Sequence, residues 1–265
     1  MSGRVIDFQT RPSVISRASV VGKKEGEGPL GKGFDMVIED DMCGLDTWEA
    51  AESHLQKTAI GLVLDKAGIK AEKIDGIFAG DLINQCTGSA FGIRDFGIPY
   101  FGIYGACSTS VLAMINAAEY VDSGKMKIAI SATSSHFCSA EKQFRFPLEY
   151  GGQRPPTAQW TVTGASAAMI SDEVEKNCPR IEKAIIGKIV DKGITDANNM
   201  GAAMAPAAAD TIYTFLNETG TSPESYDLIL TGDLGKVGSR LLCELLEKEY
   251  SLDIRKQHND TGLMM

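Results

Sequence analysis

A pattern near residue 71 recurs near residue 223, and this repeat constrains the fold more than any other feature of the sequence. Residues 71–82 read AEKIDGIFAGDL and residues 223–234 read PESYDLILTGDL, an offset of 152 positions. Without gaps, identical residues coincide in these pairs: Glu72/Glu224, Asp75/Asp227, Ile77/Ile229, Gly80/Gly232, Asp81/Asp233 and Leu82/Leu234. The same offset pairs Gly68 with Gly220, each at the end of a helical stretch. Two copies of a helix–turn–strand unit explain the agreement, although short windows of common residues also agree by chance.

Amphipathic stretches alternate with short apolar runs over most of the chain. We expect helices over residues 46–68, 84–96, 108–121, 201–220 and 236–250. We expect strands over residues 74–79, 98–103, 127–133, 161–171, 181–190 and 226–231. This alternation is typical of an α/β fold with largely parallel strands. The duplication divides the chain into a first half, residues 1–175, and an incomplete second half, residues 176–265.

Local signals refine this assignment at three places. Asp46 and Glu49 form a capping-box pattern at the start of the first helix. Pro206 is expected within the first turn of the fourth helix, because proline lacks the N–H group that an interior position needs. Residues 22–33 are rich in glycine and charge, which predicts a loop.

Cys107 lies between the predicted strand at 98–103 and the predicted helix at 108–121, within YGACSTS (104–110). The N–H groups at a helix N-terminus favour an anion, so they can lower a thiol pKa or bind a carboxylate. The small neighbouring residues permit a sharp turn that leaves the sulfur accessible. A structural cysteine packed under a helix is the alternative, since cysteines that form no disulfide are often core residues.

The stretch 134–159 interrupts the alternation of helices and strands. It holds three basic residues, Lys142, Arg145 and Arg154, together with four aromatic residues and three prolines. Long irregular connections are often binding loops or lids, and an arginine can donate two parallel hydrogen bonds to a carboxylate. The same basic residues could instead form surface ion pairs with neighbouring glutamates.

Composition excludes several classes of protein. The net charge of −9 argues against broad nucleic-acid binding. No run approaches the roughly 20 apolar residues that a membrane helix needs, and the N-terminal residues lack a secretory apolar core, so we expect a soluble, cytoplasmic type of chain. The six cysteines form no CxxC pair and no zinc-binding spacing. We therefore expect reduced thiols, no metal and no cofactor.

Four segments carry a resemblance to a known family: GIPYFGIYGACSTS (97–110), SATSSHFCSAEKQFRFPLEYGGQRP (131–155), QWTVTG (159–164) and HND (258–260). With the repeat, they resemble the thiolase-like superfamily and, within it, the stage V sporulation protein AD (SpoVAD) family, over essentially the whole chain. The resemblance implies two duplicated βαβαβ halves in α/β/α/β/α layers, with the second half truncated at its C-terminal end.

The resemblance also implies a function in sporulation. It implies a protein that binds dipicolinic acid, which is pyridine-2,6-dicarboxylate, and assists its uptake into the developing spore. The expected partners are other SpoVA proteins at the spore inner membrane, which the chain would reach as a peripheral protein, and a second copy in a homodimer.

Condensing enzymes of the thiolase fold combine a cysteine nucleophile with two His or Asn partners from the second half. Here Asp233 stands where the resemblance places one partner, and its negative charge would oppose an oxyanion. Adding the repeat offset to Cys107 leads to Asn259, if no insertion intervenes. We therefore expect a binding protein with an incomplete catalytic set. The alternative is an acyl-CoA-dependent acyltransferase or condensing enzyme that uses Cys107 as its nucleophile.

A flat dianion needs cationic groups for its two carboxylates, an aromatic or apolar slot for its ring, and N–H donors. Phe144 and Phe146 lie beside the basic residues of 134–159 and could form the slot. The predicted ligand site comprises Cys107, Ser108, Thr109, His136, Lys142, Arg145, Arg154, Asp233 and Asn259. His54 is expected on the surface of the first helix.

Overall fold

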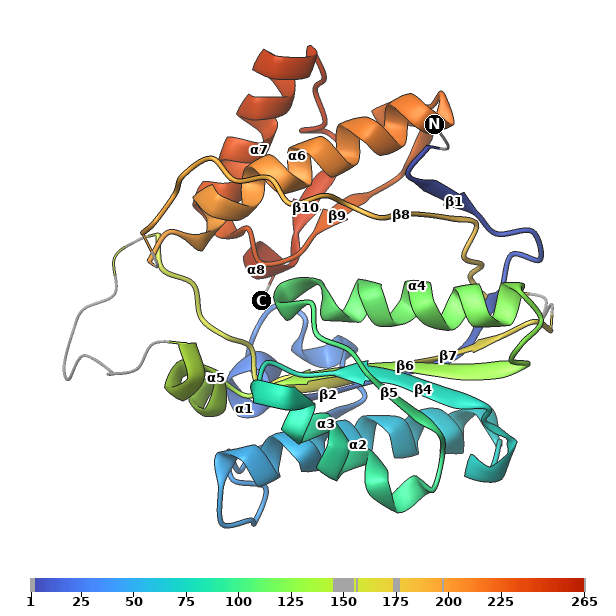
Figure 1. The fold of residues 1–265 in the computed structure, drawn as a ribbon. Coiled ribbons are helices and arrows are strands. Elements are labelled where there is room, and N and C mark those ends of the chain that lie inside the picture. Colours follow the sequence, from blue (N-terminus) through green and yellow to red (C-terminus); the bar gives the residue numbers. More distant parts are fainter. Residues whose placement is uncertain (1–2, 145–154, 156, 174–176, 197, 265) are drawn as a thin grey trace. The chain divides into compact units, whose positions relative to one another are not determined.

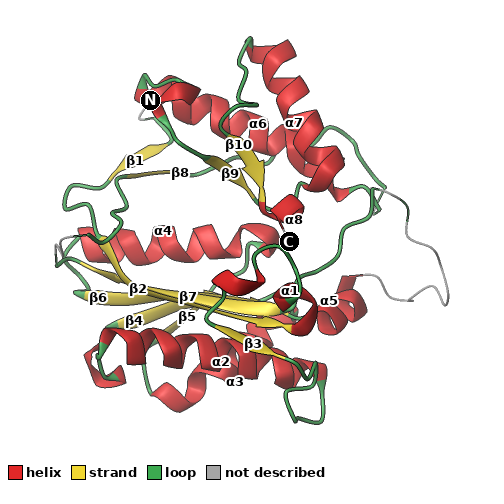
Figure 2. Cartoon of the chain, turned by 180° about the vertical axis from the view of Figure 1, so that it is seen from behind, coloured by secondary structure: helices red, strands yellow, loops and turns green. Residues whose placement is uncertain are grey.

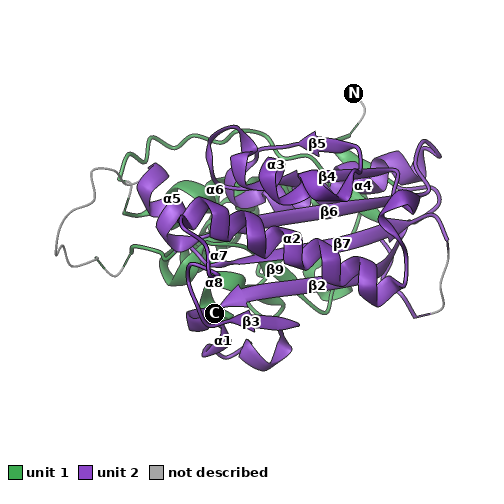
Figure 3. Cartoon of the chain, turned by 90° about the horizontal axis from the view of Figure 1, so that it is seen from below, with its two compact units in different colours: residues 1–7, 151–160, 183–265 green, residues 8–150, 161–182 purple. Residues whose placement is uncertain are grey.

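The computed structural model describes residues 3–144, 155, 157–173, 177–196 and 198–264, and they form the helices and strands of Figure 1. The chain divides into two compact units, coloured separately in Figure 3. Unit 1 comprises residues 1–7, 151–160 and 183–265, and unit 2 comprises residues 8–150 and 161–182. Among the described residues, none of the helices combines the length and the hydrophobicity that crossing a bilayer requires.

Unit 2 contains a mixed sheet whose strand order is β3-β2-β7-β6-β4-β5. The strands are β2 (Ser13–Gly22), β3 (Met36–Ile38), β4 (Gly76–Gly80), β5 (Tyr100–Gly102), β6 (Ile128–Ser135) and β7 (Gly164–Ser171). β4 is parallel to β5 and β6, and β2 is parallel to β3, but β7 is antiparallel to both β2 and β6. The prediction of largely parallel strands is therefore wrong at the centre of the sheet. Strands buried on both faces read as continuous apolar runs, and these do not reveal strand direction.

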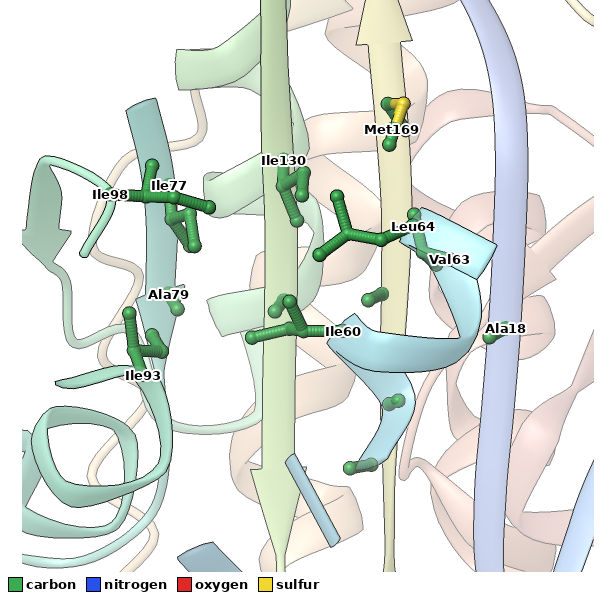
Figure 4. Packing of buried hydrophobic residues seen from close by; sticks show 14 of the residues in the cluster. Ala18, Ile60, Val63, Leu64, Ile77, Ala79, Ile93, Ile98, Ile130 and Met169 are labelled. Atoms are coloured by element: carbon green, nitrogen blue, oxygen red, sulfur yellow. The ribbon is translucent and has the colours of Figure 1, made fainter. Parts of the chain in front are cut away.

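Helices cover both faces of this sheet (Figure 2). The helices α2 (Trp48–Ala67) and α3 (Thr87–Ile93) lie on one face, and α4 (Thr109–Asp122) lies on the other. The α2 side holds the larger core, in which Leu55, Ile60 and Val63 pack against strand residues such as Ile77 and Ile130 (Figure 4). On the α4 side, small residues pack against the sheet: Ala113, Ala117 and Val121 contact Phe78, Ala129 and Ile170.

The ends of α2 have clear local causes. Its N-cap is Thr47, whose Oγ1 accepts a hydrogen bond from the Ala50 N–H at 3.1 Å. The predicted cap at Asp46 is therefore wrong by one residue. The helix ends at Gly68, whose φ of 62° lies in the left-handed region that glycine tolerates best. His54 is exposed on this helix, as expected.

Two predicted loops contain helices. Residues 22–33 include α1 (Lys23–Gly26), and the stretch that begins at 134 includes the last residues of β6 and then α5 (Phe137–Phe144). Short 3-10 turns occur at Gly31–Gly33, Ala71–Lys73, Asn84–Cys86, Arg94–Phe96, Ala106–Ser108 and Pro223–Ser225.

Unit 1 contains two small sheets and three helices among its described residues. β1 (Val5–Asp7) pairs antiparallel with β8 (Lys183–Ile185), and β9 (Ile229–Thr231) pairs in parallel with β10 (His258–Asp260). The helices are α6 (Met200–Thr219), α7 (Gly235–Tyr250) and α8 (Thr261–Met264). The core lies between α6 and α7, where Ala205, Leu242 and Leu246 are buried together with Ile254.

Two predictions for this unit are wrong in detail. The strand expected over 181–190 is confined to the three residues of β8, because those are the residues that pair with β1. Pro206 lies in the interior of α6 rather than in its first turn. It is buried there, and packing of the helix in the core of unit 1 outweighs the hydrogen bond that proline cannot donate.

The internal repeat extends to the elements themselves. Helices α2 and α6 begin and end at positions related by the same offset, 48/200 and 67/219, and both end at a left-handed glycine, Gly68 or Gly220. The 3-10 turns at Ala71–Lys73 and Pro223–Ser225 also correspond. In β4, Ile77 pairs with Tyr100 of β5, and in β9 the equivalent Ile229 pairs with His258 of β10. The predicted duplication is therefore confirmed down to the strand register.

Candidate functional site

The turn that carries Cys107 follows β5 and ends where α4 begins, as the sequence predicts. Cys107 is exposed, and the preceding residue, Ala106, has a left-handed φ of 47° that glycine would adopt more readily. The Thr109 hydroxyl accepts a hydrogen bond from the Gly105 N–H at 3.1 Å and donates one to the Ala106 carbonyl at 2.7 Å. A strained residue held by side-chain hydrogen bonds therefore presents the cysteine at the surface.

The last residue of β4, Gly80, packs closely against the backbone that leads into this turn. The Ile103 carbonyl lies so close to Gly80 that a Cβ atom added there would be 2.0 Å from the carbonyl oxygen. The same carbonyl accepts a hydrogen bond from the Cys86 thiol, with sulfur and oxygen 3.2 Å apart. The next residue, Asp81, is buried and accepts hydrogen bonds from the Ile83 and Ser89 N–H groups at 2.8 and 2.7 Å. Close packing and hydrogen bonds thus fix the backbone of Ile103 and of the segment that follows β4, next to the Cys107 turn.

The N-terminus of α4 fits an anion. Its first turn contains no acidic residue, and the side chain of its N-cap residue, Ser108, makes no capping hydrogen bond. The Ser108 hydroxyl donates to the Gly105 carbonyl at 2.7 Å and accepts no hydrogen bond from the first N–H groups of the helix. N–H groups at such a terminus attract negative charge. A ligand role for Ser108 and Thr109 stays a prediction, since both hydroxyls donate to backbone carbonyls here.

His136 directly precedes α5, and Lys142 lies in the last turn of that helix. His136 is buried, with a relative exposure of 1%. Its Nδ1 accepts the Cys138 N–H at 3.2 Å, so its Nε2–H donates to the Asp41 carbonyl at 2.8 Å. Lys142 is exposed and forms an ion pair with Glu49 at 2.9 Å. The two side chains thus have protein partners in this structure, and a ligand role remains a prediction for each.

The sequence analysis missed a buried carboxyl group, Glu52 on α2. Its side chain is inaccessible to solvent and accepts hydrogen bonds from the Ser139 hydroxyl at 2.6 Å and the Ser134 hydroxyl at 3.3 Å. Burial raises the pKa of Glu52 from 4.5 to about 7, although both hydroxyls favour the ionised form. Helical spacing offered a signal that the sequence analysis did not use, because Glu52 shares one helix face with the apolar residues Leu55 and Ala59.

Replacing Glu52 with glutamine is expected to stabilise the protein at high pH. Between pH 4.5 and about 7 the folded chain keeps a proton that the unfolded chain has released. The free energy of unfolding therefore falls as the pH rises through this window. Glutamine removes the penalty, so E52Q should gain on the order of 2 kcal/mol at pH 8 and almost nothing at pH 5. Urea denaturation at the two pH values measures both differences.

Glu49, one turn earlier on the same helix, is the matched control. Its hydrogen bond with Lys142 lowers its pKa, so E49Q should lose a little stability at pH 8 instead of gaining it. An equal gain for E52Q at pH 5 and pH 8 would show that Glu52 is not the titrating group.

The two predicted site residues of the second half, Asp233 and Asn259, lie in unit 1. Asp233 follows β9 with a left-handed φ of 58°, and the side-chain amide of Gln159 donates a hydrogen bond to its backbone carbonyl. The Asn259 side chain accepts the N–H of Asp260 at 2.8 Å. By strand register Asn259 corresponds to Phe101 rather than to Cys107, because Tyr100 corresponds to His258 and the second copy is six residues longer between its two strands. The condition attached to the Asn259 assignment, that no insertion intervenes, is not met.

A second residue that the sequence analysis missed, Asp260, holds the N-terminus of α7. Its buried carboxylate accepts hydrogen bonds from three backbone N–H groups and one hydroxyl: Leu234 at 3.1 Å, Gly235 at 2.9 Å, Gly262 at 3.0 Å and Thr231 Oγ1 at 2.7 Å. This contact satisfies N–H groups that a helix leaves open at its first turn.

His258 is part of the same network. Burial lowers its pKa, so the ring is neutral at neutral pH. Because Thr231 Oγ1 donates its proton to Asp260, it accepts the His258 Nε2–H at 2.9 Å. His258 Nδ1 faces the Ser239 hydroxyl at 3.4 Å. Both ring nitrogens thus lie against side chains of unit 1.

The predicted site is only partly described. Cys107, Ser108 and Thr109 are consecutive residues at one turn of unit 2. His136 and Lys142 belong to the same unit but to another segment, at and within α5. Arg145 and Arg154, with Phe146, lie outside the described residues. Among the described residues, no group of three or more His, Cys, Asp or Glu side chains is arranged to hold a metal ion.

Comparisons with known proteins agree on family and fold. The family described as stage V sporulation protein AD (SpoVAD) matches residues 2–265. Stage V sporulation protein AD of Bacillus subtilis (strain 168) is 43% identical over 252 residues, which are 95% of this chain and 74% of that protein. Among solved structures, a Xanthomonas campestris OleA bound with cerulenin is similar, with a TM-score of 0.66 at 15% identity, covering 96% of this chain and 83% of that one.

A second solved structure shows the same fold. The 3-oxoacyl-(acyl carrier protein) synthase III of Xanthomonas oryzae pv. oryzae has a TM-score of 0.64 at 16% identity, covering 97% of this chain and 86% of that one. At these identities the likeness concerns the fold alone.

Proposed function

The chain belongs to the stage V sporulation protein AD family and has a thiolase-like fold, and from this premise we propose that it binds dipicolinic acid and assists its uptake into the developing spore. The observation that carries the proposal is the exposed Cys107 turn at an acid-free, uncapped helix N-terminus. Backbone N–H groups there suit one carboxylate of the ligand. The basic residues Lys142, Arg145 and Arg154 are proposed for the other carboxylate.

The residues of unit 1 favour binding over catalysis. A condensing reaction needs a proton acceptor and an oxyanion donor near the nucleophile. The place expected for one of these groups is occupied by Asp233, whose negative charge would oppose an oxyanion. We further propose that the protein acts as a homodimer, peripheral to the spore inner membrane, with other SpoVA proteins as partners.

Loss of both Arg145 and Arg154 is expected to weaken dipicolinate binding. The double variant R145A/R154A removes two guanidinium groups, and a charge-assisted hydrogen bond contributes about 1.5–3 kcal/mol. We therefore expect the Kd to rise at least about tenfold in isothermal titration calorimetry. The variant R94A/R240A, which removes two exposed arginines elsewhere, should keep the original affinity. If both double variants bind equally well, the arginines do not bind the ligand.

Acyl transfer is the second candidate, and one observation favours it. The exposed Cys107 thiol follows a strained residue at a helix N-terminus, an environment that can activate a cysteine. Intact-mass analysis after incubation with acyl-CoA distinguishes the two functions. An adduct that C107S abolishes, together with turnover, would favour the enzyme. Saturable dipicolinate binding by both wild type and C107S, without an adduct, is the result that we expect.

A further inference from the structure

The proposed binding site leaves one buried carboxyl group of unit 2 without a role, that of Glu52 on α2. Its side chain is inaccessible to solvent and joins α2 to two other segments. The Ser134 hydroxyl of β6 donates to its Oε1 at 3.3 Å, and the Ser139 hydroxyl of α5 donates to its Oε2 at 2.6 Å. The neighbouring charges with the largest effects on this carboxyl group are both negative, Asp81 and Glu49. Among the described residues, no lysine, arginine or histidine forms an ion pair with Glu52, although buried carboxylates are normally paired.

The hydrogen bonds around Glu52 suit both of its protonation states. The Ser139 hydroxyl lies 2.6 Å from Glu52 Oε2 and 3.1 Å from the His136 carbonyl oxygen. When Glu52 is ionised, Ser139 donates to it. When Glu52 is protonated, its O–H donates to Ser139 Oγ, and the Ser139 proton turns to the His136 carbonyl. The Ser134 hydroxyl donates to Oε1 in either state, so Glu52 can gain or lose a proton without leaving one of these groups unpaired.

This chain of hydrogen bonds ends beside two predicted ligand residues. His136 directly precedes α5, and Lys142 lies in the last turn of that helix. Lys142 is already paired with Glu49 at 2.9 Å, and Glu49 lies one turn before Glu52 on α2. A dianion that binds to Lys142 and His136 therefore adds two negative charges to a region that already holds the carboxyl groups of Glu49 and Glu52. Repulsion between like charges is strong where water is excluded, and protonation of one carboxylate relieves it.

We propose that Glu52 takes up a proton from solvent when a dicarboxylate binds beside His136 and Lys142, so that ligand and proton are bound together. The inference rests on the proposed function and adds how the site responds to pH. The proton binds Oε2 of Glu52, the Ser139 hydroxyl reverses, and the His136 carbonyl gains a hydrogen bond. Glu52 is thus a positioning residue, which acts on the ligand through its charge and through Ser139 and does not touch it.

The acidic groups on α2 and after β4 are less suited to this proton than Glu52. Burial raises the pKa of Glu52 to about 7. The hydrogen bond with Lys142 lowers the pKa of Glu49 instead. The Asp81 carboxylate accepts hydrogen bonds from two backbone N–H groups and one hydroxyl, which need its oxygens as acceptors. Of these three carboxyl groups, Glu52 is the one that changes its protonation state near neutral pH.

The titratable groups at α5 are also less suited. An added proton on His136 Nδ1 would displace the Cys138 N–H that this nitrogen accepts at 3.2 Å. Burial raises the pKa of the Cys138 thiol, which therefore already holds its proton at neutral pH. Glu141 follows Ser139 by two positions, so the two side chains leave α5 in nearly opposite directions. Ser139 thus directs the response of α5 to Glu52.

Dipicolinate binding is expected to weaken as the pH rises through the titration of Glu52. When a ligand strengthens proton binding, linkage requires that the affinity for the ligand falls as protons become scarce. A tenfold stronger hold on the proton in the complex makes the Kd about fivefold higher at pH 8 than at pH 6. In E52Q, which cannot ionise at this position, the Kd should change less than about twofold over this range. Dipicolinate itself stays a dianion throughout, since carboxyl groups ionise below pH 6.

Isothermal titration calorimetry of dipicolinate into the 265-residue chain measures the proton directly. At pH 7.5 the titration is run in HEPES and in Tris, whose ionisation enthalpies differ. The wild type should take up about 0.3–0.5 proton per ligand, so that the apparent enthalpy differs between the two buffers. E52Q should take up almost none, and the difference isolates Glu52 because His136 and Cys107 are present in both proteins. E119Q, which removes an exposed carboxylate of α4, should behave like the wild type.

The possible negative results separate this inference from the proposed function. Absence of saturable dipicolinate binding by the wild type would overturn the proposed function and this inference with it. Saturable binding with equal apparent enthalpies in the two buffers would overturn this inference alone, and so would a pH dependence of the Kd that E52Q shares. The buffer comparison on the wild type needs no variant, so a folding defect of E52Q cannot obscure it.

Discussion

Replacing Gly80 with alanine is expected to destabilise unit 2 by about 3 kcal/mol or more. The added Cβ would lie 2.0 Å from the Ile103 carbonyl oxygen and 2.7 Å from Thr109 Cγ2. A backbone oxygen cannot rotate away as the end of a flexible side chain can. The Ile103 carbonyl also accepts the Cys86 thiol, and the Ile103 N–H donates to the Ala79 carbonyl at 2.9 Å. The clash must therefore move the turn that presents Cys107.

Urea denaturation measures this loss, and Gly61→Ala is its control. Gly61 lies inside α2, and a Cβ there would meet no atom within 4 Å. Alanine should stabilise the helix by about 0.5–1 kcal/mol, because glycine has more backbone freedom to lose on folding. If G80A is as stable as wild type, the close approach of Gly80 to Ile103 does not exist in solution.

Replacing Asp260 with asparagine is expected to cost unit 1 about 3 kcal/mol. The carboxylate of Asp260 accepts four hydrogen bonds and is inaccessible to solvent. Asparagine has the same shape, but one oxygen becomes an NH₂ group that faces N–H donors. If the NH₂ group replaces Oδ1, the Gly235 and Gly262 N–H groups lose their acceptor. If it replaces Oδ2, the buried Leu234 N–H loses its acceptor and the Thr231 hydroxyl must turn to accept instead. The negative charge that favours the N-terminus of α7 is lost as well.

Hydrogen exchange in α7 and β10, together with urea denaturation, measures this effect. The control is Asp253→Asn, which makes the same chemical change at an exposed residue paired with Arg255. Its effect should stay below about 0.5 kcal/mol. Equal losses for D253N and D260N would contradict a specific role of the buried carboxylate.

Most helices and strands could be predicted from the sequence, because hydrophobic periodicity shows which residues are buried and the repeat shows which elements correspond. The offset between residues 71 and 223 predicted two corresponding helices, and α2 and α6 begin and end at equivalent residues. The strand–cysteine–helix order around Cys107 was legible because each element has its own apolar period. The direction of the strands could not be predicted, since the buried strands β6 and β7 contain similar small residues whichever way they run.

The site was less predictable than the fold, because polar residues acquire their roles from distant neighbours. Nothing near Glu52 in the sequence indicates that Ser134 and Ser139 donate hydrogen bonds to it. Asn259 illustrates a second limit: its assignment counted positions from Cys107, whereas the pairing of β9 with β10 shows that it corresponds to Phe101. The strand β2 was also missed, since three serines and an arginine interrupt the apolar pattern of a strand that has neighbours on both sides in the sheet.

The six additional residues between β9 and β10 leave the pairing of these strands unchanged relative to β4 and β5. The longer helix α7 and the loop after it absorb the difference, where the first copy has the shorter α3. Between these two copies, the connection therefore differs by six residues while the register of the strands that it joins is the same. The geometry of the paired strands tolerates this change because the added residues lie in a helix and a loop outside the sheet.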